Sequence, residues 1–239
     1  MTNFKSIGII GGMGPAATCD LMRKIIERTD ANDDQHHIHT YVDCNVNIPD
    51  RTEAILHHGE SPVPEIVKSG KKLQEMGADV LVMPCHTGHY FFDEIVSHFS
   101  IPMLDITKET AEFLKKNNIK KAGILATDGT LKSNIYKKTL ELYGIEAVYP
   151  EENEQKLFMR LIYDHVKCGK LKKDELPEQE IRKSLHSLSK KGAEIFVLAC
   201  TELPIVFEIL DITENTIDPT LLLAEAAIRF SGGKVRREK

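Results

Sequence analysis

Two cysteines end two similar stretches of sequence that lie 115 residues apart. The first stretch reads GADVLVMPC and ends at Cys85, and the second reads GAEIFVLAC and ends at Cys200. The same offset places SIGIIGG, close to the N-terminus, on KAGILAT in the middle of the chain. An apolar run that ends in a cysteine predicts a buried strand with a thiol at its carboxyl end. Two such thiols indicate chemistry in which one takes a proton from a carbon and the other returns a proton to the opposite face.

Each of these cysteines also precedes a predicted helix. A helix N-terminus favours a thiolate, so we expect the pKa of both thiols to lie below that of free cysteine. A buried cysteine can instead serve as a small apolar side chain, which explains one such residue more readily than a matched pair. The other cysteines, Cys19, Cys44 and Cys168, have no counterpart at this offset and are predicted to be structural or incidental.

A glycine-rich segment, GGMGPAAT, runs from Gly11 to Thr18 after the first predicted strand and opens a helix. It partly matches the dinucleotide-binding fingerprint, which would make the protein an NAD-dependent oxidoreductase. That fingerprint needs an acidic residue about 20 positions further on, whereas Asp43 comes 29 residues after Gly14. A turn whose backbone N–H groups bind a small carboxylate is therefore the favoured interpretation.

Further polar side chains follow other predicted strands. Arg51, in NIPDRT, could bind a carboxylate with its planar guanidinium, the alternative being an ordinary surface arginine. Thr127 and Thr130 occupy the place that corresponds to the glycine-rich turn, where hydroxyl groups could bind the same anion. Cys85, His86 and His89 could contribute to a zinc site, but no fourth ligand stands at a diagnostic spacing, so no metal is predicted.

Short apolar runs alternate with helical patterns along the chain, which predicts an α/β fold with mostly parallel sheets covered on both faces. We expect a first domain of residues 1–105, joined by a C-terminal helix at about 219–231, and a second domain of residues 106–218. The expected strands are 6–10, 38–44, 80–83, 103–104, 122–126, 147–149 and 195–198. The expected helices are 15–29, 62–76, 89–98, 106–116, 131–143, 154–167, 178–190 and 219–230.

The composition narrows the class of protein. The 239 residues are 41% hydrophobic and 28% charged, which is ordinary for a globular chain. A net charge of −5 gives no electrostatic attraction to nucleic acid, and no apolar run approaches the ~20 residues that span a membrane. Five cysteines, an odd number, and the lack of a secretory signal lead us to expect reduced thiols and a cytoplasmic location.

Taken together, these segments resemble the aspartate/glutamate racemase family of cofactor-independent amino-acid racemases. The resemblance covers nearly the whole chain and rests on GIIGGMGPAAT, PDRTEAIL, the MPC segment that continues to His89, GILATDGT and LACTELP. It favours the aspartate racemase branch, because Cys200, Thr201 and Glu202 stand where glutamate racemases usually have Cys-Thr-His.

The resemblance implies a role for particular residues. Cys85 and Cys200 match the two catalytic cysteines, Arg51 matches the arginine that binds the substrate's side-chain carboxylate, and Lys167 matches a lysine that shares this task. The remaining residues expected around the amino acid are Met13, Gly14, Thr18, His86, Thr87, Thr127, Thr130, Thr201 and Glu202. The family's architecture implies two similar three-layer α/β/α domains related by a pseudo-twofold axis, an active site in the cleft between them, a homodimer and no cofactor.

The segment after Cys85 departs from the family pattern: His86 stands where an asparagine is usual, and Gly88 where an alanine is usual. The His86 ring could displace the substrate, widen the preference, or, when protonated, stabilise the Cys85 thiolate. The sequence thus predicts a racemase of an acidic amino acid, aspartate first and glutamate second. The alternatives are a related isomerase or racemase of another small carboxylate, and a non-catalytic protein that binds acidic amino acids.

Overall fold

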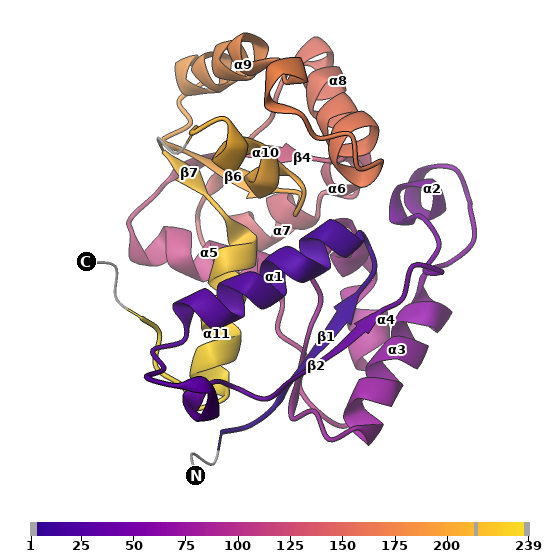
Figure 1. Ribbon diagram of the computed structural model, residues 1–239. Coiled ribbons are helices and arrows are strands. Elements are labelled where there is room, and N and C mark those ends of the chain that lie inside the picture. Colours follow the sequence, from indigo (N-terminus) through magenta and orange to yellow (C-terminus); the bar gives the residue numbers. More distant parts are fainter. Residues whose placement is uncertain (1–3, 213–214, 237–239) are drawn as a thin grey trace. The chain divides into compact units, whose positions relative to one another are not determined.

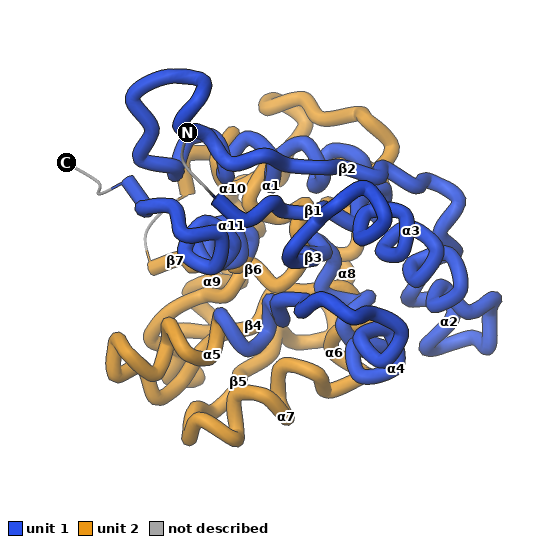
Figure 2. Tube along the Cα trace, turned by 90° about the horizontal axis from the view of Figure 1, so that it is seen from below, with its two compact units in different colours: residues 1–109, 220–239 blue, residues 110–219 orange. Residues whose placement is uncertain are grey.

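The computed structural model describes residues 4–212 and 215–236, and the chain divides into two compact units. Unit 1 comprises residues 1–109 and 220–239, and unit 2 comprises residues 110–219 (Figure 2). The chain passes from one unit to the other within α5 (Ile106–Lys116) and at the start of α11 (Pro219–Phe230). Each unit contains its own parallel sheet with helices packed against it (Figure 1).

Unit 1 contains a three-stranded sheet in the order β2–β1–β3, with both pairs parallel. Its strands are β1 (Ile7–Gly11), β2 (Thr40–Cys44) and β3 (Val80–Val82), and its other helices are α1 (Pro15–Arg28), η1 (Asp34–His36), α2 (Arg51–Leu56), α3 (Val63–Glu75), η2 (Thr87–Phe91) and α4 (Phe92–Val96). Ile7 and Ile9 pack on α1 and α11, whereas Ile10 packs on α3 and α4. Alternate residues of the buried strand thus supply the two layers of the core.

Unit 2 contains a four-stranded sheet in the order β5–β4–β6–β7, again entirely parallel. Its strands are β4 (Lys121–Ala126), β5 (Glu146–Val148), β6 (Ile195–Ala199) and β7 (Thr216–Ile217), and its helices are α6 (Asp128–Lys132), α7 (Ile135–Leu142), α8 (Glu152–Arg160), the π-helical segment η3 (Leu161–Lys167), η4 (Lys173–Glu175), α9 (Glu178–Lys190) and α10 (Leu203–Ile209). Leu125 and Leu198 face α8, α9 and α10, whereas Ile124 and Val197 face α7. The predicted α/β class with mostly parallel sheets is confirmed.

The sequence repeat is also a structural repeat. In unit 1, Ile7 pairs with Val80, and in unit 2 Ala122 pairs with Ile195, so both partners of the second pair lie 115 residues beyond those of the first. The following two pairs of each ladder keep the same correspondence. In both sheets the first strand is central, the second lies on one side of it and the third on the other. The offset read from the sequence therefore gives the register of both central strand pairs.

The acidic residue that follows the Gly-Ala pair has a structural role in both units. Asp79 accepts hydrogen bonds from the backbone N–H of Ser6 at 2.7 Å and from its hydroxyl at 2.9 Å. These bonds hold the pKa of the Asp79 carboxyl below its usual value, with the backbone N–H as the main cause. Glu194 likewise accepts from the backbone N–H groups of Lys120 and Lys121. Each carboxylate thus anchors the beginning of the neighbouring strand.

Three predicted helices are interrupted. Residues 131–143 were expected to form one helix, but Asn134 has a φ of 58°, which separates α6 from α7. Residues 89–98 form part of η2 followed by α4, and residues 154–167 change from α8 to a π-helical segment at Leu161. The expected strand at 103–104 forms a single bridge between Met103 and Leu81. Hydrophobic periodicity reports such changes poorly, because the apolar face continues through them.

The backbone conformation of Gly12, in the glycine-rich turn after β1, gives a testable prediction of stability. Its φ is +93°, and a Cβ at this position would overlap the Asn45 carbonyl. We expect Gly12→Ala to lower the free energy of unfolding by about 3 kcal/mol, the sum of a left-handed backbone and an overpacked contact. Gly169→Ala is the control, since Gly169 has a φ of +70° with nothing near its Cβ position, and should cost about 1 kcal/mol. Urea denaturation measures both, and equal losses would contradict the overlap.

Candidate functional site

The candidate residues of unit 1 lie at the carboxyl ends of its parallel strands. Met13 follows β1, Asn45 follows β2, and Cys85 comes three residues after the end of β3. Met13 and Cys85 belong to one buried apolar cluster, together with Ile48. The carboxyl edge of a parallel sheet is where α/β proteins bind ligands, so this edge is the candidate site of the unit.

The glycine-rich turn is held by Thr18. The Thr18 hydroxyl accepts a hydrogen bond from the Gly12 N–H at 2.9 Å and donates one to the Gly14 carbonyl at 3.0 Å. A Cβ on Gly11 would overlap the Thr18 side chain, so the close approach of turn and helix requires glycine there. Thr18 was predicted to lie next to the substrate, and the structure shows that its hydroxyl shapes the turn.

Arg51 is buried and bonded to the turn, which excludes the interpretation as an ordinary surface arginine. It is the first residue of α2, which Asp50 caps by accepting from the N–H groups of Thr52 and Glu53. The Arg51 side chain is 6% exposed, and its guanidinium donates to the carbonyls of Met13 at 3.0 Å and Pro49 at 3.1 Å. The structure therefore brings Arg51 and Met13 together at one edge of the sheet.

Two neutral histidines lie beside Cys85. The N–H of Ile106 donates to Nε2 of His89 at 3.3 Å, so the ring proton is on Nδ1, which donates to the Cys85 carbonyl at 2.8 Å. His89 thus has a fixed tautomer and supports the backbone of Cys85. His86 is 2% exposed, and burial lowers the pKa of its ring well below the usual value. The suggestion that a protonated His86 stabilises the Cys85 thiolate is therefore wrong.

Cys85, His86 and His89 are candidate zinc ligands by their spacing in the sequence. Among residues 4–212 and 215–236, no three His, Cys, Asp or Glu side chains gather in an arrangement suited to a metal ion. His89 in particular uses both ring nitrogens on backbone groups. His89 therefore supports the backbone of the segment that carries Cys85.

The candidate residues of unit 2 lie at the equivalent strand ends. Thr127 follows β4 and caps α6: its hydroxyl accepts from the Thr130 N–H at 3.2 Å and donates to the Thr130 hydroxyl at 3.1 Å. Gln155, which the sequence did not single out, donates to the Ala126 carbonyl at 2.9 Å and to Asp128 at 2.8 Å. No local pattern marked Gln155, because its partners are distant in sequence. It fixes the end of β4 from α8.

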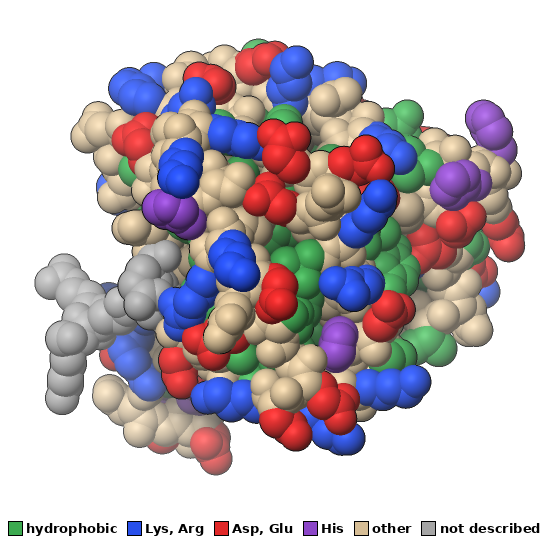
Figure 3. Space-filling model, turned by 90° about the horizontal axis from the view of Figure 1, so that it is seen from above, with side chains coloured by type: hydrophobic (Ala, Val, Ile, Leu, Met, Phe, Trp, Pro, Cys, Tyr) green, Lys and Arg blue, Asp and Glu red, His purple; other side chains and the backbone are tan. Residues whose placement is uncertain are grey.

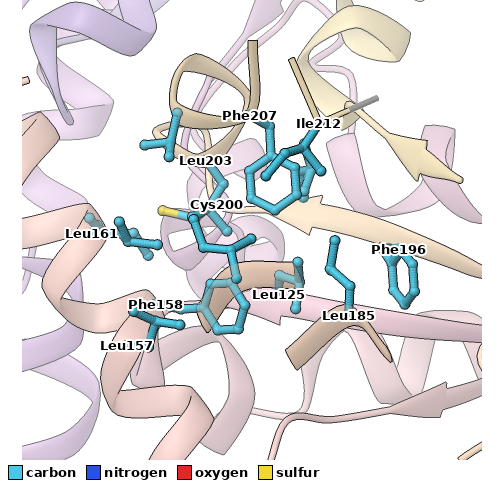
Figure 4. Packing of buried hydrophobic residues seen from close by; sticks show 14 of the residues in the cluster. Leu125, Leu157, Phe158, Leu161, Leu185, Phe196, Cys200, Leu203, Phe207 and Ile212 are labelled. Atoms are coloured by element: carbon cyan, nitrogen blue, oxygen red, sulfur yellow. The ribbon is translucent and has the colours of Figure 1, made fainter. Parts of the chain in front are cut away.

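Cys200 lies directly after β6, within the largest apolar cluster of unit 2. Leu161, Leu203 and Phe207 belong to the same cluster (Figure 4). The Cys200 Sγ donates to Oε2 of Glu202 at 3.1 Å, and the Thr201 hydroxyl donates to the same oxygen at 3.1 Å. The structure thus places three consecutive predicted residues in one buried hydrogen-bonded group.

The predicted lowering of the thiol pKa is wrong for Cys200. Burial raises the pKa of this thiol well above its usual value, and the charge of Glu202 adds to the effect. The charge of Lys167 acts in the opposite direction. A short helix end, at α10 (Leu203–Ile209), does not outweigh the cost of ionising a sulfur that is 6% exposed and next to a carboxylate.

Lys167 ends the π-helical segment that follows α8. Its Nζ lies 4.9 Å from the centre of the Tyr163 ring, a cation–π contact within one turn. Leu161 and Val166 of the same segment pack in the cluster that contains Cys200. The segment therefore carries a cation whose charge acts on the buried Cys200 thiol.

A groove on unit 1 and the charged surface contribute little to the candidate site. A groove of about 530 Å³ lies between α1 and β2, and apart from Thr18 its lining contains none of the predicted site residues. On the face shown in Figure 3, basic and acidic side chains are interspersed, and neither sign dominates. No helix in the described part of the chain is long and apolar enough to cross a membrane.

Comparisons with known proteins identify the family. A family model described as Asp/Glu/Hydantoin racemase matches residues 10–227. The chain belongs to this racemase family. The resemblance drawn from the motifs is confirmed, and with it the assignment to the amino-acid racemases, a class of isomerase.

Individual relatives extend the comparison along the whole chain. The chain is 28% identical over 226 residues to the broad-specificity amino-acid racemase RacX of Bacillus subtilis (strain 168). The alignment covers 93% of this chain and 96% of the relative. A structure of Picrophilus torridus aspartate racemase shares 33% identity and a TM-score of 0.85, covering 97% of this chain and 96% of that one. An aspartate racemase homologue from Pyrococcus horikoshii OT3 shares 26% identity and a TM-score of 0.75, with coverages of 95% and 99%.

His86 gives a pH-dependent prediction. Because folding lowers its pKa, the unfolded chain binds more protons below about pH 6.5, and the folded state loses stability as the pH falls. This residue should contribute at most about 1.4 kcal/mol per pH unit to that loss. We expect His86→Asn to show a smaller drop in unfolding free energy between pH 7.5 and 5.5 than the unchanged protein. If urea denaturation gave the same decrease in unfolding free energy for the two proteins, the lowered pKa of His86 would be refuted.

Proposed function

We propose that this protein interconverts the L and D forms of an acidic amino acid, aspartate in the first place, without a cofactor. Cys85 and Cys200 are the two acid–base groups. One observation carries the proposal: the cysteines follow the equivalent strands β3 and β6, whose ladders have the same register in the two units. The likeness to an aspartate racemase over nearly the whole chain supports it.

In the proposed reaction one sulfur, as a thiolate, removes the α-proton, and the electron pair of the broken C–H bond moves onto the α-carboxylate. The other sulfur, as a thiol, gives its proton to the opposite face of the same carbon. An amino acid held by both carboxylates cannot turn over between the two steps, which is why two bases are needed. Backbone and hydroxyl donors at the strand ends, around Met13, Gly14, Thr127 and Thr130, would stabilise the charge on the α-carboxylate.

Arg51 and Lys167 are the cations proposed for the side-chain carboxylate. Arg51 is buried and held by the carbonyls of Met13 and Pro49, so its guanidinium is fixed in place before the substrate arrives. Lys167 acts electrostatically on Cys200. Fixed cations of this kind favour a substrate with a second carboxylate, because they need no reorganisation on binding.

A second candidate is a racemase of broad specificity. The relative from Bacillus subtilis bears that description, and the neutral ring of His86 in place of the usual asparagine changes the donors beside Cys85. The dinucleotide alternative is less favourable, because the Gly12 N–H, which a pyrophosphate would need, is bonded to Thr18. Chiral chromatography of a panel of amino acids distinguishes a narrow from a broad preference.

We further infer that the protein is a homodimer and that residues 1–105 with about 219–231, and residues 106–218, are its two domains. All five cysteines are free thiols, and we propose a location in the reducing cytoplasm. Light scattering after size-exclusion chromatography measures the oligomer. If both catalytic thiols contact one substrate, aspartate should protect them together from alkylation. The exposed Cys19, Cys44 and Cys168 should react unchanged and serve as internal controls.

The two-base scheme predicts the effect of removing either sulfur. We expect Cys85→Ala and Cys200→Ala each to lower racemisation of aspartate at least about 10³-fold, because one proton transfer is lost. Each variant should retain exchange of the α-hydrogen of one enantiomer only with solvent deuterium, and the two variants should act on opposite enantiomers. NMR in D₂O measures the exchange. Full racemisation by either variant would exclude the scheme, and Cys168→Ala is the matched control.

Arg51→Lys tests the carboxylate contact. The lysine keeps the charge but loses the planar fork, so we expect kcat/KM for aspartate to fall about 10- to 100-fold and that for a neutral amino acid to change much less. Arg23→Lys, on the exposed side of α1, is the control. Equal losses for acidic and neutral substrates would assign Arg51 a purely structural role.

A further inference from the structure

Cys85 and Cys200 hold equivalent places in the repeat, but their neighbours differ. By the 115-residue correspondence of the two ladders, Thr87 stands in unit 1 where Glu202 stands in unit 2. The Cys200 thiol is hydrogen-bonded to the Glu202 carboxylate. Within the described residues of unit 1, no carboxylate is hydrogen-bonded to the Cys85 sulfur. The pair of sulfurs is therefore chemically unequal.

Glu202 is an unusual acceptor. The side chain is 2% exposed, and one oxygen, Oε2, accepts both the Cys200 thiol and the Thr201 hydroxyl. The other oxygen, Oε1, is buried and has no hydrogen-bond partner among the described residues. Both of these hydrogen bonds to the side chain, from the Cys200 thiol and the Thr201 hydroxyl, therefore fall on Oε2.

A thiolate at Cys200 would lie directly against this carboxylate. Two negative charges at that distance in a buried place repel strongly, and neither has water to screen it. The other charged group that acts on the thiol is Lys167, at the end of the π-helical segment, and its effect is smaller than that of Glu202. The arrangement therefore favours the protonated sulfur.

We propose that Glu202 is a positioning residue that keeps Cys200 protonated in the resting enzyme, so that Cys85 is the sulfur that ionises first. This inference rests on the proposed two-cysteine racemisation. The active resting form then has a thiolate at Cys85 and a thiol at Cys200. In turnover from this form, the α-proton goes to Cys85, and Cys200 gives its proton to the opposite face. Turnover leaves a thiol at Cys85 and a thiolate at Cys200; after product release Cys85 loses its proton to solvent water and Cys200 takes one from solvent water, which restores the resting form.

The proposal has a consequence for the pH range of activity. A racemase of this kind needs one thiolate and one thiol, so its activity falls at high pH when the second sulfur ionises. By holding the proton of Cys200, Glu202 extends the active range toward alkaline pH. The acidic limit, set by the ionisation of Cys85, does not depend on Glu202.

The direct test is the pH dependence of thiol alkylation in Glu202→Gln without substrate. The rate of reaction with iodoacetamide is followed for each cysteine by peptide mass spectrometry. We expect the midpoint for Cys200 to fall by about one pH unit or more, because the amide carries no charge. The midpoint for Cys85 in the same sample should stay unchanged. Glu208→Gln, on the exposed side of α10, is the matched control and should shift neither.

The kinetic test is the pH profile of kcat/KM for aspartate. In Glu202→Gln the alkaline limb should move to lower pH by the same amount as the alkylation midpoint of Cys200, while the acidic limb stays in place. A general loss of structure would lower the whole profile without moving one limb. An unchanged alkaline limb would overturn the proposal.

The proposed racemase function and the proposed role of Glu202 can be refuted separately. If the wild-type protein racemises nothing, the proposed function fails, whereas the alkylation shift still reports on Glu202. If the Cys200 midpoint does not move in Glu202→Gln, the role of Glu202 fails, whether or not the protein is a racemase. Should Glu202→Gln not fold, Thr201→Val removes the second donor to Oε2 and should raise the Cys200 midpoint. A lower or unchanged midpoint in that variant would contradict the proposal.

Discussion

The parallel pairing of β1 with β3 and of β4 with β6 is the constraint on which the rest of this structure depends. Both ladders have the same register, and each is anchored where the third strand begins by a carboxylate, Asp79 or Glu194, that binds the backbone of the central strand. A slip of one residue would turn every apolar side chain of these strands to the opposite face. The correct register therefore also determines where Cys85 and Cys200 emerge.

Burial controls the chemistry of these strand ends more than helix dipoles do. The short helix that follows Cys200 does not outweigh the apolar surroundings of its sulfur, and burial raises the pKa of this thiol. The same effect keeps His86 neutral, while His89 is fixed by backbone bonds.

The two units supply different polar groups to equivalent positions. Unit 1 offers a glycine turn, a buried arginine and neutral histidines, whereas unit 2 offers threonine hydroxyls, a lysine and a buried glutamate. The equivalent strand ends of the repeat therefore differ in their polar groups.

Much of this arrangement followed from the sequence by itself. The 115-residue offset, the apolar runs and the residues after each strand identified the parallel sheets, the strand-end thiols and the family, because these features are local and periodic. Tertiary structure alone decided the burial of Arg51, the tautomer of His89, the contact of Gln155 with β4 and the raised pKa of Cys200. Each of these depends on how far water is excluded and on partners distant in the chain, which no local pattern records.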